Sequence, residues 1–343
     1  MNMEANSAES SLSVIRPCRI LSTGMHLPVA VHSATIEEAH GLPEGWSLRH
    51  SGVKTRHQVT TENVADLGAR AAQNALENAG LLISDIDVLI TAGGSFDQII
   101  PSQAAMTLAL MPGGEEARCE AFHINTTCLS FVNAFAIAAD KLQFPGIQRV
   151  LVVASEVASK GIGPENWETL TLFGDGAAAM VLERSSNPNC GLVSHMHRTF
   201  SEGLRAAQIP GGGIAKWFAQ HPFEPSLHHF QMDGRELLRL TLQHLPGFMD
   251  DFFEHAGTSW PEITWTIPHQ ASKTGLGIIP KLAQVSPEQV VNILEERGNC
   301  IAASIPMGLH ELVSNAKLQS GDTAMLCGTS AGYAIGSLLY QHG

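Results

Sequence analysis

The sequence predicts a layered α/β fold made of two similar halves. Segments with the period of a strand alternate with segments that have helical spacing, and the connections between them are short. The order of these segments starts again after about residue 190. A chain of 343 residues is also long for a single core, which favours two domains or a duplicated fold. We place the boundary between residues 186 and 187.

The first half contains buried strands separated by helices. Residues 18–24 form a first strand, and residues 85–94 are a nearly continuous apolar run, as expected in a sheet covered on both faces. Residues 63–79 have one apolar face and are followed by Gly80, so they predict a helix with its stop signal. The remaining elements are a helix at 101–111, a strand and helix at 121–142, a strand at 149–156, and a Gly-Asp-Gly turn that leads into a strand ending near residue 183.

The second half repeats this order after a strand at 191–197. Residues 199–232 are rich in Gly, Pro and aromatic residues and indicate an inserted loop region, and a helix follows at 233–253. Residues 263–272 take the place of 88–94. A strand within 290–299 and a helix at 302–314 correspond to the unit at 121–142, and residues 323–328 and 332–340 correspond to the last two strands. Two such halves would hold a site between them.

Cys128 stands where a strand changes into a helix. The residues before it alternate between apolar and polar, and the apolar residues after it fall at helical spacing. Asn125, Thr126 and Thr127 are natural N-cap residues at this change. The free N–H groups and the dipole of a helix start favour negative charge, so we expect a thiolate-prone nucleophile. A buried core cysteine is the alternative that this stretch leaves open.

Two polar residues occupy matching places in the second half. His269 ends a strand, where ligands bind in open α/β sheets, and Asn299 follows a strand and Gly298. Taken singly, such a histidine is more often a hydrogen-bonded structural residue, and such an asparagine is more often part of a turn. Their combination with Cys128 on corresponding connections predicts a common site.

Composition and charge exclude several classes of function. The net charge of −13 argues against a general nucleic-acid binder. Six scattered cysteines match neither a zinc site nor a disulfide framework, which favours reduced thiols in the cytoplasm. Residues 1–13 lack the apolar segment of a signal peptide, and no apolar run is long enough to span a membrane. Residues 46–57 are basic, which indicates either a solvated loop or a contact for a phosphate-bearing substrate.

The chain resembles the β-ketoacyl-ACP synthase III group of the thiolase-fold condensing enzymes. The matching stretches are residues 20–28, 46–52 with Arg56, 125–128, 173–177, 232–234, 268–271, 298–306 and 336–337. They follow in order from residue 18 to the C-terminus, and residues 199–230 are the least similar part. The resemblance implies a duplicated thiolase-like fold, layered α-β-α-β-α, and a homodimer.

The resemblance also implies a Cys-His-Asn triad, carried here by Cys128, His269 and Asn299. Cys128 would take an acyl group from an acyl thioester such as acyl-CoA. The backbone N–H groups of Cys128 and Gly332 would form the oxyanion hole. His269 and Asn299 would stabilise the enolate formed when malonyl-acyl carrier protein loses CO₂. No metal or other cofactor is expected.

Two substrate-contact positions, His50 and Ile100, depart from the pattern of that group. Trp46 matches a residue that stacks near the CoA adenine, but the Arg usual four residues later is His50 here, with Arg49 beside it. Ile100 replaces a Phe that reaches across the dimer in many members, so a longer acyl chain could fit. A smaller side chain and an altered CoA contact favour a specialised enzyme.

The presumed helix after His269 carries Lys273 and Lys281, which could contact an acidic carrier protein or be ordinary surface lysines. Relatives that condense without decarboxylation use a Glu near residue 100. No Glu lies between Gly93 and Pro112, which favours decarboxylative condensation.

Other functions fit less well. Residues 328–332 match G-x-S-x-G, but a strand follows and too little chain remains for a hydrolase acid and histidine. The order Cys, His, Asn also occurs in papain-like proteases, whose signature and fold do not match. Three alternatives remain with the same acyl-cysteine chemistry or fold: a condensing enzyme or acyltransferase of secondary metabolism, a non-catalytic partner subunit, and a thioesterase.

Overall fold

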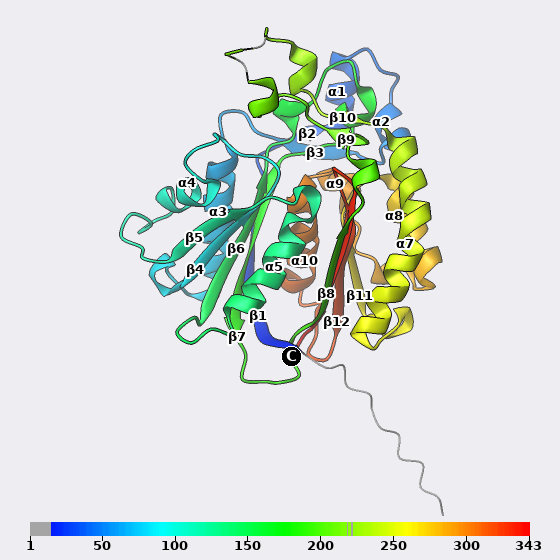
Figure 1. The fold of residues 1–343 in the computed structure, drawn as a ribbon. Helices are drawn as coiled ribbons and strands as arrows, with labels where there is room; N and C mark the ends of the chain where they lie inside the picture. Colours follow the sequence, from blue (N-terminus) through cyan, green and yellow to red (C-terminus); the bar gives the residue numbers. More distant parts are fainter. Residues whose placement is uncertain (1–14, 218, 221) are drawn as a thin grey trace, which may run out of the picture.

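The computed structural model describes residues 15–343 except 218 and 221 (Figure 1). The expectation for residues 1–13 lies outside the described residues. One sheet of nine strands runs through the molecule in the order β11-β12-β13-β8-β1-β7-β6-β4-β5. The strands are β1 Arg16–His26, β4 Val88–Ala92, β5 Glu120–Ile124, β6 Arg149–Glu156, β7 Gly176–Arg184, β8 Gly191–Thr199, β11 Trp265–Pro268, β12 Thr323–Ser330 and β13 Ala334–Gln341.

The sheet consists of two halves with the same strand pattern. In the first half β4 is parallel to β6, and β6, β7 and β1 are antiparallel neighbours. In the second half β11 is parallel to β12, and β12, β13 and β8 are antiparallel neighbours. The first strands of the halves, β1 and β8, meet at Arg16 and Leu192. The predicted duplication is confirmed, and the boundary at residues 186 and 187 falls in the connection from β7 to β8.

Helices cover the sheet on both sides and fill the space between its halves. The principal helices are α3 Val64–Ala79, α4 Gln103–Ala109, α5 Ser130–Lys141, α7 Gly234–Ala256, α8 Lys273–Ala283 and α10 Ser304–Ser314. Figure 1 shows α5 and α10 side by side at the centre, with α3 and α4 outside one half and α7 and α8 outside the other. Three apolar clusters follow these layers, and the largest surrounds α5 and α10.

Short elements complete the upper part of the molecule in Figure 1. They are β2 Val29–His32, β3 Thr55–Gln58, β9 Ala207–Gln208, β10 Gln231–Met232, α1 Ser33–Ala39, α2 Trp46–His50, α6 Trp167–Leu170 and α9 Leu294–Arg297. Of the predicted insertion at 199–232, β9 and β10 form a two-stranded sheet. The basic segment 46–57 is not a solvated loop throughout, because Arg56 and His57 on β3 are buried.

The predicted strand within 290–299 is wrong. Val290 forms only an isolated bridge with Thr266, and the chain then turns into α9. The side chain of Asn292 accepts a hydrogen bond from the Leu294 N–H at 3.1 Å, which starts that helical turn. Asn299 therefore follows a short helix and Gly298, which has a positive φ of 69°.

Candidate active site

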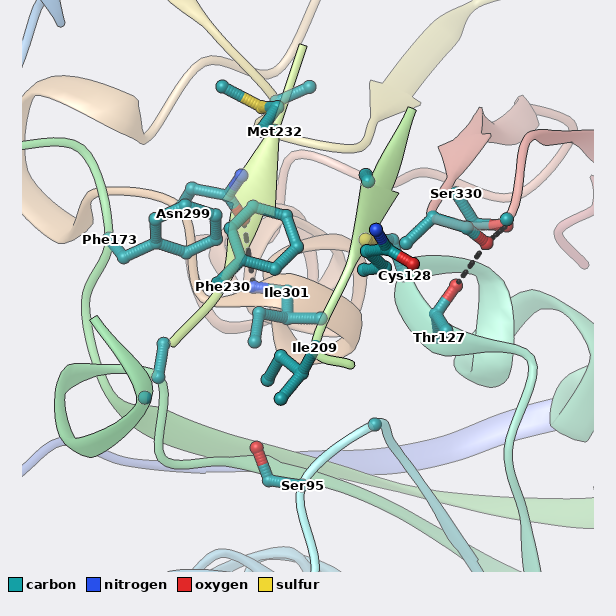
Figure 2. Close-up of a pocket in the computed structure, with 18 of the residues that line it drawn as sticks. Ser95, Thr127, Cys128, Phe173, Ile209, Phe230, Met232, Asn299, Ile301 and Ser330 are labelled. Carbon is teal, nitrogen blue, oxygen red and sulfur yellow. Dashed lines mark hydrogen bonds between the residues drawn. The ribbon is translucent and has the colours of Figure 1, made fainter. Parts of the chain in front are cut away.

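A cavity of about 620 Å³ lies at the ends of β4, β6, β11 and β12. Cys128, His269 and Asn299 all line it, although they come from distant parts of the chain. Figure 2 shows Cys128 and Asn299 facing the cavity from different sides. Much of the remaining wall is apolar, and it includes Ile162, Phe173, Ile209, Phe230, Met232, Leu237 and Ile301.

Cys128 lies in a strained turn between β5 and α5. The turn residue Thr127 has a positive φ of 51°, which is uncommon for a residue with a side chain. Two side chains stabilise this conformation: Asn125 Oδ1 accepts the Thr127 N–H at 3.0 Å, and Ser130 Oγ accepts the Thr126 N–H at 2.9 Å. Residues 127–129 form a 3₁₀ turn, so α5 begins at Ser130, two residues after the predicted start.

The turn at Asn299 repeats this construction in the second half. Ile301 has a φ of 48°, and the Asn299 Oδ1 accepts its N–H at 2.9 Å. Ser304 Oγ accepts the Cys300 N–H at 3.0 Å, as Ser130 does in the first turn. Because its carbonyl oxygen is used in this way, the Asn299 amide has its N–H₂ group left to donate to a ligand.

His269 is held at the end of β11 and is only 6% exposed. Its backbone N–H donates a hydrogen bond to the Cys327 carbonyl at 2.8 Å. Gly328 permits this position, since a Cβ there would stand 2.7 Å from the His269 Cβ. Burial lowers the pKa of His269 to about 4, so the ring is neutral at physiological pH. Its Nδ1 has no hydrogen-bond partner among the residues that the structure describes.

The surroundings of Cys128 act against the thiolate-prone character that the sequence pattern predicts. Burial raises its pKa to about 12, and the negative charge of Glu156 adds to the rise. Hydrogen bonding at the Ala331 and Cys128 backbone lowers the pKa, but by less than burial raises it. The helix-start effect is therefore outweighed by the low-dielectric surroundings. Cys128 and His269 are both neutral in the ligand-free protein.

Gly332 also lines the cavity, next to Ala331. Its φ of 74° lies in the left-handed region that glycine adopts readily. The hydroxyl of Thr127 donates to the Ala331 carbonyl at 3.3 Å, which ties this loop to the Cys128 turn (Figure 2). An oxyanion hole made by the N–H groups of Cys128 and Gly332 stays a prediction.

The predicted CoA contacts on α2 do not line the cavity. The rings of Trp46 and His50 stack at 4.1 Å between centroids, and Trp167 approaches Trp46 edge-on at 6.5 Å. Arg49 is exposed and donates to the Glu44 carbonyl at 3.0 Å.

The other predicted contacts also lie outside it. Ile100 is 83% exposed and does not reach the cavity of its own chain. Lys273 donates to the Leu48 and Arg49 carbonyls at 3.2 and 3.4 Å, so its ammonium group ties α8 to α2. Lys281 is exposed, and with Lys273 it borders a second groove of about 510 Å³. A carrier-protein contact at these lysines stays a prediction.

Sequence reasoning missed one buried residue beside the site. Glu156 ends β6 and is 0% exposed, and its carboxylate accepts hydrogen bonds from the backbone around the cavity. An acidic residue at the end of the apolar run 149–156 was the available signal.

Within residues 15–343, leaving aside 218 and 221, no group of three or more His, Cys, Asp or Glu side chains is arranged to hold a metal ion. Over the same residues, none of the helices combines the length and the apolar character that crossing a membrane requires.

Comparison with known proteins agrees with this geometry. The family model described as 3-oxoacyl-[acyl-carrier-protein (ACP)] synthase III matches residues 122–199, and the model of its C-terminal part matches residues 253–342. β-Ketoacyl-[acyl-carrier-protein] synthase III 1 of Vibrio vulnificus (strain YJ016) is 33% identical over 328 residues, which cover 94% of this chain and 99% of the relative.

Solved structures give the same result. The 3-oxoacyl-[acyl-carrier-protein] synthase III of Aquifex aeolicus VF5 superposes with a TM-score of 0.84 at 25% identity, covering 95% of this chain and 100% of that one. The priming β-ketosynthase of the R1128 polyketide biosynthetic pathway also gives 0.84 at 25% identity, over 95% and 97% of the two chains. The predicted family resemblance and thiolase-like fold are confirmed. This chain belongs to the β-ketoacyl-[acyl-carrier-protein] synthase III family of acyl-transferring condensing enzymes.

Proposed function

We propose that Cys128 carries the acyl group during catalysis. The thiol adds to the carbonyl carbon of an acyl-CoA or acyl-carrier-protein thioester, and the departing thiolate takes up the thiol proton. The N–H groups of Cys128 and Gly332 receive the developing oxyanion. Because Cys128 and His269 are both neutral, the proton leaves the thiol as the bond to the acyl carbon forms and passes to the departing thiolate, so His269 keeps its own N–H for the second step.

His269 and Asn299 then act on the second thioester, malonyl-acyl carrier protein. They donate hydrogen bonds to its thioester oxygen while the carboxylate leaves as CO₂. The resulting carbanion attacks the acyl-cysteine and releases the β-ketoacyl product. The anchored carbonyl of Asn299 supports this role, because it presents the amide N–H₂ group to the cavity. The steps need only these side chains and no metal or other cofactor.

The observation that carries this proposal is the convergence of Cys128, His269 and Asn299 on one largely apolar cavity. An apolar wall suits an alkyl chain and disfavours water, which would hydrolyse the acyl-enzyme. CoA is the less favoured donor, because the ring of Trp46 is already stacked against His50. A donor carried by acyl carrier protein needs no adenine contact.

The test uses intact mass spectrometry after incubation with acyl-CoA and acyl-carrier-protein donors of increasing chain length. The wild type should gain one acyl group and Cys128→Ala none. Asn299→Ala should still gain the acyl group, but its condensation with malonyl-acyl carrier protein should fall by about 100-fold or more. An adduct that persists in Cys128→Ala, or equal losses of both steps in Asn299→Ala, would contradict the assigned roles.

The homodimer is also a proposal, supported by the exposed side of β5. This strand ends the sheet, with β4 as its only strand partner among the described residues. A free edge with apolar surface beside it is a common site of association. Phe96, Ile99, Ile100 and Leu110, in and next to the segment that holds α4, are 49–83% exposed.

A further inference from the structure

Glu156 is a fully buried carboxylate without a cationic partner. It is 0% exposed, and none of the ion pairs in the described part of the chain includes it. Backbone N–H groups take the place of a cation: Gly94 donates to Oε1 at 2.7 Å and Ser95 to Oε2 at 2.9 Å. The N–H of Ala302 approaches Oε1 at 3.4 Å. A buried acidic group with this arrangement needs an explanation beyond packing.

These donors belong to two segments that shape the cavity. Gly94 and Ser95 follow β4, and both line the cavity. Ala302 stands three residues after Asn299, in the turn that presents the Asn299 amide. One carboxylate thus fixes the position of the Asn299 turn relative to the cavity wall. The fit is close, since a Cβ on Gly93 would stand 3.0 Å from Glu156 Oε1.

Ala302 in the second half occupies the position that Cys128 occupies in the first half. Ala302 follows Asn299 by the same number of residues as Cys128 follows Asn125, and the two turns have the same hydrogen bonds. The N–H of Ala302 therefore corresponds to the N–H that Cys128 would offer to the substrate oxyanion. In the second half this N–H faces an anion of the protein itself, the carboxylate of Glu156.

The charge of Glu156 also reaches the nucleophile. A Cβ added to Gly94 would stand 3.9 Å from Glu156 Oε1 and 3.8 Å from the Thr127 Cα, so the carboxylate lies close to the Cys128 turn. Burial is the largest cause of the raised pKa of Cys128 and of Cys300, and the charge of Glu156 adds to both shifts. Burial raises the pKa of Glu156 itself to about 7, whereas its hydrogen bonds with Ser95, Gly94 and Ala302 lower it.

We propose that Glu156 is a positioning residue of the condensation step, which ties the Asn299 turn to the cavity wall and places a negative charge beside the Cys128 turn. The first part rests on the function proposed above. The second part concerns the thiol alone and needs no substrate.

The charge effect is tested by alkylation of Cys128 with iodoacetamide, followed at the Cys128 peptide by mass spectrometry. Wild type and Glu156→Gln should react at similar rates near pH 6, where Glu156 is largely protonated. Above about pH 8 Glu156→Gln should react at least about threefold faster, because one negative charge beside the thiol is gone. Glu156→Asp keeps the charge and should follow the wild type. Identical profiles for all three proteins would refute the charge effect.

The positioning effect is tested by separating the two half-reactions. In Glu156→Gln the remaining oxygen can still accept from Gly94 and Ala302, but the N–H₂ group that replaces Oε2 faces the Ser95 N–H, donor against donor. The amide must shift to relieve this contact, so condensation should fall by about 10- to 100-fold while acylation of Cys128 changes by less than about threefold. Glu156→Asp should recover part of the loss in condensation. Equal losses in both steps would mean general damage and would overturn this role.

Glu183→Gln is the matched control, because Glu183 is a carboxylate on β7 whose partners are Arg19 and Arg149, on neighbouring strands of the same sheet. It should change stability without changing the alkylation profile. Absence of an acyl adduct in the wild type would count against the proposed function, whereas the alkylation profiles would still decide the charge effect.

Discussion

At the scale of single residues, burial decides the protonation of the site. Desolvation is the largest cause of the raised pKa of Cys128 and the only cause of the lowered pKa of His269. Both shifts disfavour a thiolate–imidazolium pair. A Cys128 that acts as the proposed nucleophile would therefore start from the thiol, the form less reactive toward oxidants and alkylating agents.

The thiol should consequently show no plateau of reactivity in the physiological range. A thiol with pKa near 12 gains about tenfold in thiolate for each pH unit below that value. Alkylation of Cys128 should then keep rising from about pH 6 to pH 9, since His269 is neutral throughout this range. Cys128→Ala identifies reaction at other cysteines. An alkylation rate that reaches a plateau by about pH 7 would instead show that Cys128 and His269 form a thiolate–imidazolium ion pair.

At the scale of elements, one close backbone contact sets a helix against the sheet, and two repeated turns position the site. Gly24 on β1 lies flat against α3, where a Cβ would stand 2.3 Å from the Ala75 nitrogen and 2.5 Å from the Ala71 oxygen. The contact brings the first half of the sheet against its outer helix. The turns at Thr127 and Ile301 hold left-handed residues that cost about 1–3 kcal/mol each, and the surrounding hydrogen bonds maintain them.

Gly24→Ala should accordingly destabilise the protein by at least about 2 kcal/mol, because the contact is with backbone atoms that cannot move aside. Gly247→Ala is the control, since Gly247 lies inside α7 with nothing within 4 Å of the added Cβ. Alanine should there stabilise by about 0.5–1 kcal/mol. Urea denaturation measures both. Equal effects of the two substitutions would contradict the contact at Gly24.

The sequence predicts an element correctly where local residues determine its bounds. It predicts less well where contacts with distant parts of the chain determine them. The strand at 149–156 has the predicted bounds, and the helix before Gly80 ends where predicted, because an apolar run and a terminal glycine are local signals. The strand predicted within 290–299 is wrong. Its apolar residues suggest a strand, but Asn292 Oδ1 accepts the Leu294 N–H where the chain turns into a helix.

The site shows the same division. The convergence of Cys128, His269 and Asn299 on one cavity follows from the strand ends before Cys128 and His269 and from the repeated order of the two halves, although Asn299 itself follows a short helix. The protonation of Cys128 does not, because it depends on the surroundings that the folded chain provides. Glu156 was missed for the same reason: its neighbours come from residues near 94 and 302, far away in the sequence.

At the scale of the whole molecule, β5 and β11 are the two edge strands of the nine-stranded sheet. Val290 forms an isolated bridge with Thr266 on β11, whereas among the described residues β5 has no strand partner other than β4. The side bearing β5 and the apolar segment around Ile100 is therefore where we expect a second copy to pack.

Light scattering should give about twice the chain mass of 36.7 kDa for the wild type. Ile100→Asp places a charge at the centre of the apolar segment and should shift the protein toward the monomer or weaken the dimer at least about tenfold. Leu282→Asp, at another exposed apolar position on α8, should leave the mass unchanged. A monomeric wild type would exclude the proposed assembly.

The two matching turns also give the site an internal pseudo-symmetry. Each turn has an asparagine, a left-handed residue two positions later, and a serine whose hydroxyl accepts a backbone N–H. Where the first turn has Cys128, the second has Ala302. A substitution in one turn can therefore be compared with the same substitution in the other, so that each turn serves as an internal control for its counterpart.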